Sequence, residues 1–136
     1  MPSKEVTEIF ESLGLAPPTD AATGGFAVVD PSNGETIATL AMDDGEAAMA
    51  KLGRAVAAFP SFRAVPGPKR GEIVRRMGEI LRHHKDNLAR ILCAEVGKGI
   101  EEARGEVQEM IDICDFATGL SRSLGGRTFM SEREGH

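Results

Sequence analysis

Large aromatic side chains are scarce in this sequence, which has six phenylalanines and neither tryptophan nor tyrosine in 136 residues. Aromatic rings supply much of the volume of a protein core, and a chain of this length buries only about two thirds of its unfolded surface. We therefore expect a thin core. The length allows one domain at most, which excludes a two-domain cofactor enzyme within these residues. The apolar fraction of 41% is ordinary for a chain that folds.

An excess of positive charge is also lacking, because 21 acidic residues outnumber 16 basic ones and give a formal net charge of -5. Such a chain does not attract phosphate backbones or anionic lipids. No apolar run approaches the roughly 20 residues of a membrane span, and the first ten residues lack the basic and apolar regions of a signal peptide. We expect a cytoplasmic protein with no nucleic-acid partner and no membrane partner.

Only two cysteines are present, Cys93 and Cys114, and both fall within apolar helical patterns. A disulfide framework is excluded, and neither thiol has a histidine within one helical turn to activate it, so packing is the expected role. His83 and His84 are adjacent, which on a helix points their rings about 100° apart and disfavours joint metal binding. We expect His84 at the border of an apolar stripe and His83 in water, with no catalytic and no metal-binding residue.

Nucleotide-binding fingerprints are incomplete. Gly97-Lys98 resembles the end of a phosphate-binding loop, but Leu92 stands where such a loop has glycine and Gly99 where it has serine or threonine. The glycine pairs at 24–25 and 125–126 do not extend into a dinucleotide-binding turn. We expect no cofactor-binding residue, and Gly97 is better explained as a helix cap.

The first forty residues predict a short helix and a hairpin. Apolar residues at helical spacing indicate a helix over 3–14, and residues 16–25 have the composition of a linker. Strand-like runs at 26–29 and 35–40 flank an Asn33-Gly34 step, which favours a β-hairpin.

Helices are expected over the rest of the chain. Asp43, three residues before Glu46, suggests a capping box for a helix that ends at Pro60. Pro68 suits the first turn of a long second helix, which either continues to Gly97 or restarts near 84–85 with a cap from 86–87. A last helix is predicted from about 101 to 123. The expected fold class is α+β and helix-dominated, with one hairpin followed by three to four helices.

The last predicted helix carries two apolar stripes, which is more than one hairpin and two helices can cover. The first stripe is Val107, Met110, Ile111, Cys114 and Ala117, and the second is Ile113, Phe116 and Leu120. We expect the second stripe to stay partly exposed. The same helix has an acidic flank of Glu101, Glu102, Glu106, Glu109, Asp112 and Asp115, which is most simply a solvated face.

Several segments in order resemble one enzyme family. The runs at 63–70, 95–98 and 102–107 are similar to the amino-terminal part of the NAD(P)-dependent aldehyde dehydrogenase superfamily. The runs at 105–117, 119–122 and 131–133 resemble its antiquitin class, the α-aminoadipic semialdehyde dehydrogenases. The resemblance covers about 26–136. It departs at Phe62, where the family commonly has tryptophan, and at Glu134, where related tails often have proline.

This resemblance implies an incomplete part of the aldehyde dehydrogenase fold, with residues 1–25 as a helix and linker and 26–136 as part of the cofactor-binding domain. It also implies an aldehyde-oxidising enzyme that uses NAD or NADP and forms a homo-oligomer. The nucleophilic cysteine, the general-base glutamate and the nucleotide-binding sheet are not matched here, and Cys93, Cys114 and Lys98 do not match the family's motifs. We therefore expect this chain to be inactive by itself.

One site residue carries over from the resemblance. In the antiquitin class the position matching Glu109 can face the amino group of the substrate, so Glu109 is a candidate substrate-binding residue of a complete enzyme. Its carboxylate would pair with an ammonium group and select amino-aldehydes or semialdehydes. The alternative function is a self-standing helical interaction module without catalytic activity, which would dock a partner on the two-striped helix.

Overall fold

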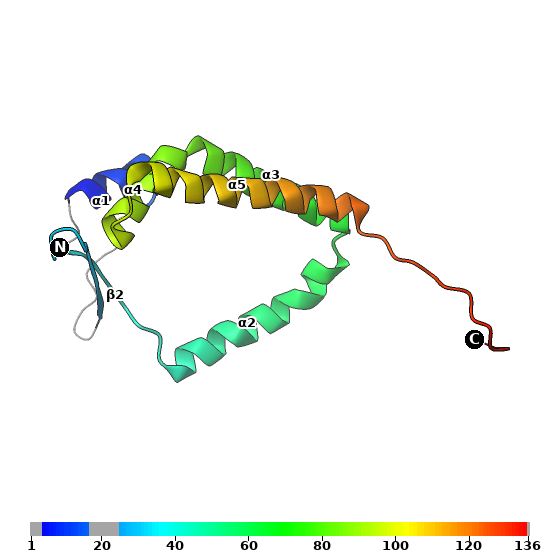
Figure 1. Cartoon of the computed structure of the whole chain (residues 1–136). Coiled ribbons are helices and arrows are strands. Elements are labelled where there is room, and N and C mark those ends of the chain that lie inside the picture. The colour runs from blue at the N-terminus through cyan, green and yellow to red at the C-terminus, as the bar shows by residue number, and fades with distance from the viewer. Residues whose placement is uncertain (1–3, 17–24, 136) are drawn as a thin grey trace.

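The computed structural model describes residues 4–16 and 25–135, which form five helices and two strands (Figure 1). In chain order they are α1 (Lys4–Ser12), β1 (Phe26–Val29), β2 (Thr36–Leu40), α2 (Gly45–Ala64), α3 (Gly67–His83), α4 (Lys85–Val96) and α5 (Ile100–Ser123). The predicted α+β, helix-dominated class is confirmed. Most of the predicted linker, at 17–24, lies outside the described residues.

The predicted hairpin is present as an antiparallel pair in which Phe26 lies opposite Leu40. Its turn is closed by the Asp30 carboxylate, which accepts hydrogen bonds from the backbone N–H of Ser32 at 2.8 Å and from its hydroxyl at 2.6 Å. Gly34 has φ +77°, a conformation that glycine adopts without steric cost. These two strands form the only sheet within the described residues.

Two expectations about the bounds of α2 are wrong. The cap is Asp44, whose extended backbone lets its carboxylate accept from the N–H of Ala47 at 2.8 Å, while Asp43 pairs with Lys51 instead. Pro60 does not end the helix, which continues to Ala64. The loss of one backbone hydrogen bond at Pro60 is tolerated there, and the helix ends before Pro66, which favours extended backbone at Val65.

The long second helix is interrupted, as one of the two interpretations predicted. His84 ends α3 and begins α4, but no side chain among the described residues caps α4, so the expected cap from Asp86 and Asn87 is wrong. Those two residues lie inside the first turn of α4 and contact other elements. Asp86 accepts from Nε of Arg104 at 2.9 Å, and Asn87 donates to the hydroxyl of Ser12 at 2.8 Å.

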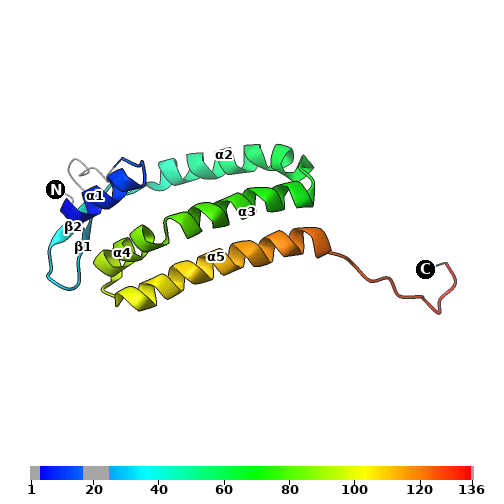
Figure 2. The same cartoon turned by 90° about the horizontal axis from the view of Figure 1, so that it is seen from above.

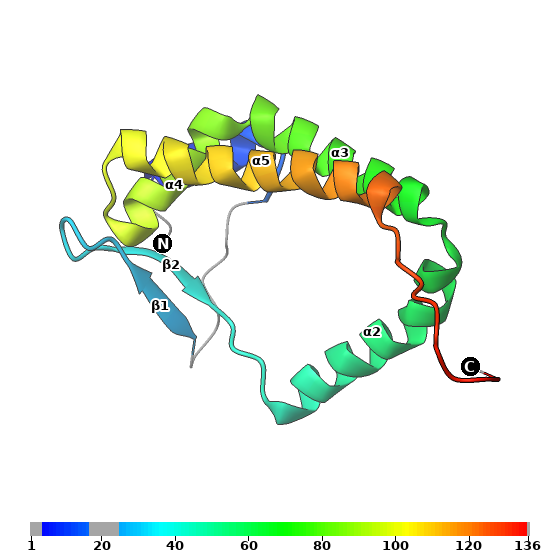
Figure 3. The same ribbon diagram turned by 45° about the vertical axis from the view of Figure 1, so that its right-hand side comes forward.

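The core lies where α5 packs along α3 and α4, which run beside it in all three ribbon views (Figures 1–3). It is built from small and β-branched side chains rather than aromatic rings, as the composition predicts. Its buried members are Ala89, Ala103, Val107 and Ile111, with Leu81, Leu88, Leu92 and Cys93 packed against them.

Two glycines of α3 set how closely it approaches α5. A Cβ added at Gly71 would lie 2.6 Å from Cβ of Ser121, and one at Gly78 would lie 2.9 Å from Cβ of Cys114. Real Cβ atoms do not come so near, so these positions admit no side chain at the present helix separation. Two residues without a Cβ therefore bring the α3 and α5 backbones together.

A smaller cluster joins the hairpin and α1 to α4. Val6 and Ile9 of α1 and Ile37 and Ala38 of β2 are buried. The predicted cap Gly97 is confirmed, with φ +76° and its N–H donating to the carbonyl of Cys93 at 2.9 Å. A Cβ at Gly97 would lie 2.7 Å from Cγ of Pro31 in the hairpin turn. Arg90 also pairs with Glu5 at 3.0 Å across α4 and α1.

Helix α2 lies apart from the α3–α5 pair in Figures 1 and 3, and none of its residues is buried. Its apolar residues Met49, Leu52, Val56 and Phe59 are all more than half exposed. On α5, Ile113 and Phe116 are also more than half exposed, so the expected exposure of the second stripe is confirmed, whereas Met110 of the first stripe is exposed as well. Within the described part of the chain, no helix has the length and apolar character to cross a membrane.

Candidate functional site

An open, mostly apolar depression of about 590 Å³ lies where α3, α4 and α5 meet. Helix α5 contributes most of its lining, including two carboxylates. The lining residues are Met77, Leu81, Leu92, Glu106, Glu109, Met110, Ile113 and Cys114. An apolar surface with a few placed charges is typical of a site for a small organic molecule.

Glu109, the residue singled out from the sequence, lines this depression from α5. Its side chain is exposed, and no hydrogen bond or ion pair to it is found among the described residues. A carboxylate beside apolar surface and without a cationic partner is able to accept a charge-assisted hydrogen bond from an ammonium group. The structure thus places Glu109 at a surface that suits that chemistry.

Glu106, one helical turn earlier, lines the same depression but already has a partner. Its carboxylate accepts a hydrogen bond from Nζ of Lys98, and the same ammonium lies 3.5 Å from Oε1 of Glu102. The hydrogen bond that Lys98 donates to Glu106 is the main cause that raises the pKa of Lys98 above its ordinary value. Lys98 therefore stays protonated at neutral pH. Glu106 thus has a cationic partner, whereas none is found for Glu109 among the described residues.

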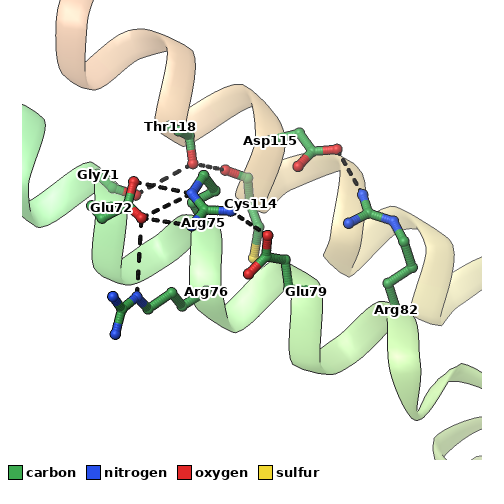
Figure 4. A network of polar contacts seen from close by, with 9 residues as sticks. All are labelled: Gly71, Glu72, Arg75, Arg76, Glu79, Arg82, Cys114, Asp115 and Thr118. Carbon is green, nitrogen blue, oxygen red and sulfur yellow. Dashed lines mark hydrogen bonds and ion pairs between the residues drawn. The ribbon is translucent and has the colours of Figure 1, made fainter.

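Polar contacts between α3 and α5 help to fix the rotation of α5 (Figure 4). Arg82 Nη2 of α3 lies 3.0 Å from Asp115 Oδ2 of α5. Within α5, the hydroxyl of Thr118 donates to the carbonyl of Cys114 at 2.7 Å. The Thr118 oxygen also lies 3.4 Å from the carbonyl oxygen of Gly71. Because side chains on one helix turn together, these contacts hold the face that carries Glu109 toward the depression.

A second group of charges runs along α3. Arg75 donates to both carboxylate oxygens of Glu72, with Nε at 3.0 Å from each, and also pairs with Glu79 (Figure 4). The hydrogen bonds from Arg75 are the main cause that lowers the pKa of Glu72, and the same pairs raise the pKa of Arg75. Glu72 and Arg75 are half-buried and Glu79 is exposed, so water still screens each pair and it stabilises the chain only slightly.

The cysteines are packed and the two histidines lie where the sequence indicated, one at the border of the apolar surface and one in water. Cys114 is buried against α3 and Cys93 is half-buried beside the core. His83 is exposed and His84 is half-buried, with ring centroids 4.6 Å apart. No group of three or more metal-ligating side chains that could hold an ion occurs in the described residues.

Sequence patterns alone did not find the Lys98–Glu106 pair or the Gly71 and Gly78 contacts. A glycine inside a helical pattern is a signal for close packing, but it does not name the partner. The charge of Lys98 is evident from the sequence, yet its partner depends on how the α4–α5 connection turns. Both features link residues that only the packed helices bring together.

Comparison with known proteins identifies the relatives of this chain. The sequence profile of the aldehyde dehydrogenase family matches residues 19–136. The alpha-aminoadipic semialdehyde dehydrogenase of Rattus norvegicus is 44% identical over 106 residues, which are 78% of this chain and 20% of that protein. The aldehyde dehydrogenase family 7 member A1 of Malus domestica is 38% identical over 146 residues, covering 98% of this chain and 28% of that protein.

Solved structures agree on the fold. The 3,6-anhydro-L-galactose dehydrogenase in complex with NAP superposes with a TM-score of 0.74 and 29% identity, over 85% of this chain and 24% of that one. The lactaldehyde dehydrogenase from Escherichia coli superposes with a TM-score of 0.77 and 23% identity, over 90% of this chain and 25% of that one. At this identity the likeness supports the fold alone. The chain spans only about a fifth to a quarter of the length of most of these relatives. With a family profile over most of its length, the chain belongs to the aldehyde dehydrogenase family, and its relatives place it in the antiquitin class.

Proposed function

We propose that this chain is the amino-terminal portion of an oxidoreductase that oxidises an amino-aldehyde or semialdehyde to a carboxylic acid with NAD or NADP. The observation that carries the substrate class is the uncompensated Glu109 carboxylate beside an apolar depression on α5. A substrate ammonium would bind the carboxylate while its carbon chain contacts the apolar lining. Glu109 is then a specificity residue, and the chemistry takes place in the rest of the enzyme.

The described residues do not fit a dinucleotide site. Their two strands form an antiparallel hairpin, and no glycine-rich turn leads from a strand into a helix. We therefore assign no cofactor-binding residue and no catalytic residue to this chain, and we propose that it is inactive alone. NAD or NADP, the nucleophilic cysteine and the general base belong to the remainder of the enzyme.

Exposed apolar residues support an assembly. Ile113 and Phe116 of α5 and Met49 and Val56 of α2 are all at least 60% exposed, which is unusual for a chain that functions as a monomer. We propose that the remainder of the enzyme covers these faces and that the enzyme is a cytoplasmic homo-oligomer. The same exposure favours the alternative of a self-standing interaction module. Intact mass of the natural protein separates the two, since a mass far above 14.5 kDa supports the enzyme.

The test of the substrate class is Glu109→Gln in the complete enzyme, because the amide keeps the shape and removes the charge. We expect kcat/KM for an amino-aldehyde to fall by about five- to 150-fold, the range that about 1 to 3 kcal/mol of charge-assisted hydrogen bonding gives. A simple aliphatic aldehyde of equal length should change little, because it has no ammonium to lose.

Asp112→Asn is the matched control. It removes a carboxylate from the same helix one turn later, where the side chain accepts from Gln108 at 2.9 Å and does not line the depression. We expect it to change neither substrate. Equal losses for both substrates in Glu109→Gln would indicate a structural role, and no loss for either would make Glu109 part of the solvated face.

A further inference from the structure

The two carboxylates that line the depression are not equivalent. Glu106 and Glu109 are separated by one turn of α5 and line the same surface, but within the described part of the chain only Glu106 is bound to a cation, Lys98. Lys98 itself is not one of the lining residues. It therefore alters the charge of the depression without occupying the space that a ligand would fill.

Lys98 is held in place by the chain on both sides. It sits between Gly97 and Gly99 in the connection from α4 to α5, where Gly97 has φ +76° and packs against the hairpin turn. Only 28% of its side chain is exposed, compared with 41% for that of Glu106. A partly buried ammonium between fixed backbone segments compensates its partner more effectively than a freely moving surface lysine.

We propose that Lys98 is a specificity-determining residue: by pairing with Glu106 it leaves Glu109 as the one lining carboxylate that has no cationic partner among the described residues. The site then favours a ligand with one ammonium group over a ligand with none or with two. This inference rests on the proposed function, because it assumes that the depression receives the ammonium end of the substrate. To that proposal it adds how many ammonium groups the preferred ligand carries.

A purely structural role for Lys98 makes a different prediction. If Lys98 only joined the start of α5 to the loop before it, its loss would weaken binding of all ligands together or lower stability. If it sets the charge of the depression, its loss exposes a second carboxylate. Binding of a dication is then strengthened more than binding of a monocation, because each positive charge interacts with the added negative one.

The experiment measures binding of three probes to the complete enzyme, in which the exposed apolar faces of this chain are covered, at low ionic strength: butanol, butylammonium and butane-1,4-diammonium. Methyl NMR signals of Met77 and Met110 report binding, since both side chains line the depression. The unaltered enzyme should bind butylammonium more tightly than butanol. Lys98→Met should raise the affinity for the diammonium probe relative to that for butylammonium by about three- to tenfold. This is the change expected for one added negative charge several ångströms away in a solvated site.

A double variant separates charge from structure. Lys98→Met with Glu106→Gln removes both charges of the pair and also the pair itself, so it should return the probe ratio to that of the unaltered enzyme. If Lys98 had only a structural role, the double variant would not restore the probe ratio. Lys98→Arg keeps the charge and should leave the ratio unchanged, and it serves as the control if Lys98→Met lowers stability.

Failure of this inference and failure of the proposed function give different results. If Glu109→Gln abolishes the preference for butylammonium over butanol while Lys98→Met leaves the probe ratio unchanged, the role of Lys98 is wrong and that of Glu109 stands. If Glu109→Gln changes nothing, or if the unaltered complete enzyme binds none of the probes, the ammonium site itself is wrong and both proposals fall.

Discussion

Replacing Gly71 with alanine tests whether close helix contact holds this fold together. The added Cβ would lie 2.1 Å from Oγ and 2.6 Å from Cβ of Ser121, so α3 and α5 must separate or Ser121 must move. Forcing one methyl into a packed contact costs about 1 to 3 kcal/mol, while exchanging glycine for alanine in a helix returns about 1 kcal/mol. We expect a net loss of about 0 to 2 kcal/mol in the free energy of unfolding, from the difference of these two effects.

Gly105→Ala is the matched control, because Gly105 lies inside α5 and an added Cβ there meets nothing within 4 Å. It should stabilise the chain by about 1 kcal/mol through helix propensity alone. Urea unfolding followed by circular dichroism measures both variants, and the expected difference between them is about 1 to 3 kcal/mol.

Ser121→Gly supplies the second half of a double-mutant cycle. It removes both atoms that the new Cβ would meet, after which the carbonyl oxygen of Thr118, at 3.6 Å, is in ordinary contact with that Cβ. Gly71→Ala should therefore be less harmful, or even favourable, in the Ser121→Gly background. If Gly71→Ala stabilises the unaltered chain as much as Gly105→Ala does, the close approach of α3 and α5 is refuted.

Two further predictions concern the chain by itself. Because Ile113, Phe116 and the apolar residues of α2 are exposed, the purified chain should self-associate or bind the dye ANS, and a compact monomer by sedimentation that binds no ANS would contradict this. Because Arg75 lowers the pKa of Glu72, the Glu72 carboxylate stabilises the folded chain at pH values above the ordinary glutamate pKa, and this contribution is lost as the pH falls through the lowered one. Glu72→Gln should remove that part of the acid dependence of urea unfolding, and an unchanged dependence would contradict the pairing.

Local patterns in the sequence determined most of the elements. Strand spacing and the Asn33-Gly34 step predicted the hairpin, and Pro68 and Gly97 correctly marked where helical segments begin and end. These features depend on steric limits of φ and on missing N–H groups, which act within a few residues. The helical period is equally local, and it alone assigns the charges and the apolar stripes of the last helix to their faces.

Only the three-dimensional structure shows which local signal takes effect when two compete. Asp43 and Asp44 are both able to cap α2, and the extended backbone at Asp44 selects one of them. Pro60 did not end its helix, which continues to Ala64. The His84 break between α3 and α4 likewise formed without the side-chain cap that the sequence offered.

The same distinction applies to the site. The sequence singled out Glu109 through its resemblance to a family. Neither the lack of a cationic partner for Glu109 among residues 4–16 and 25–135 nor the pairing of Glu106 with Lys98 could be deduced from spacing. Both depend on where the α4–α5 connection places an ammonium group and on how closely Gly71 and Gly78 let α3 approach α5. Residues far apart in the chain acquire a common electrostatic environment only when packing brings them together, because charge interactions fall off with distance in space rather than in sequence.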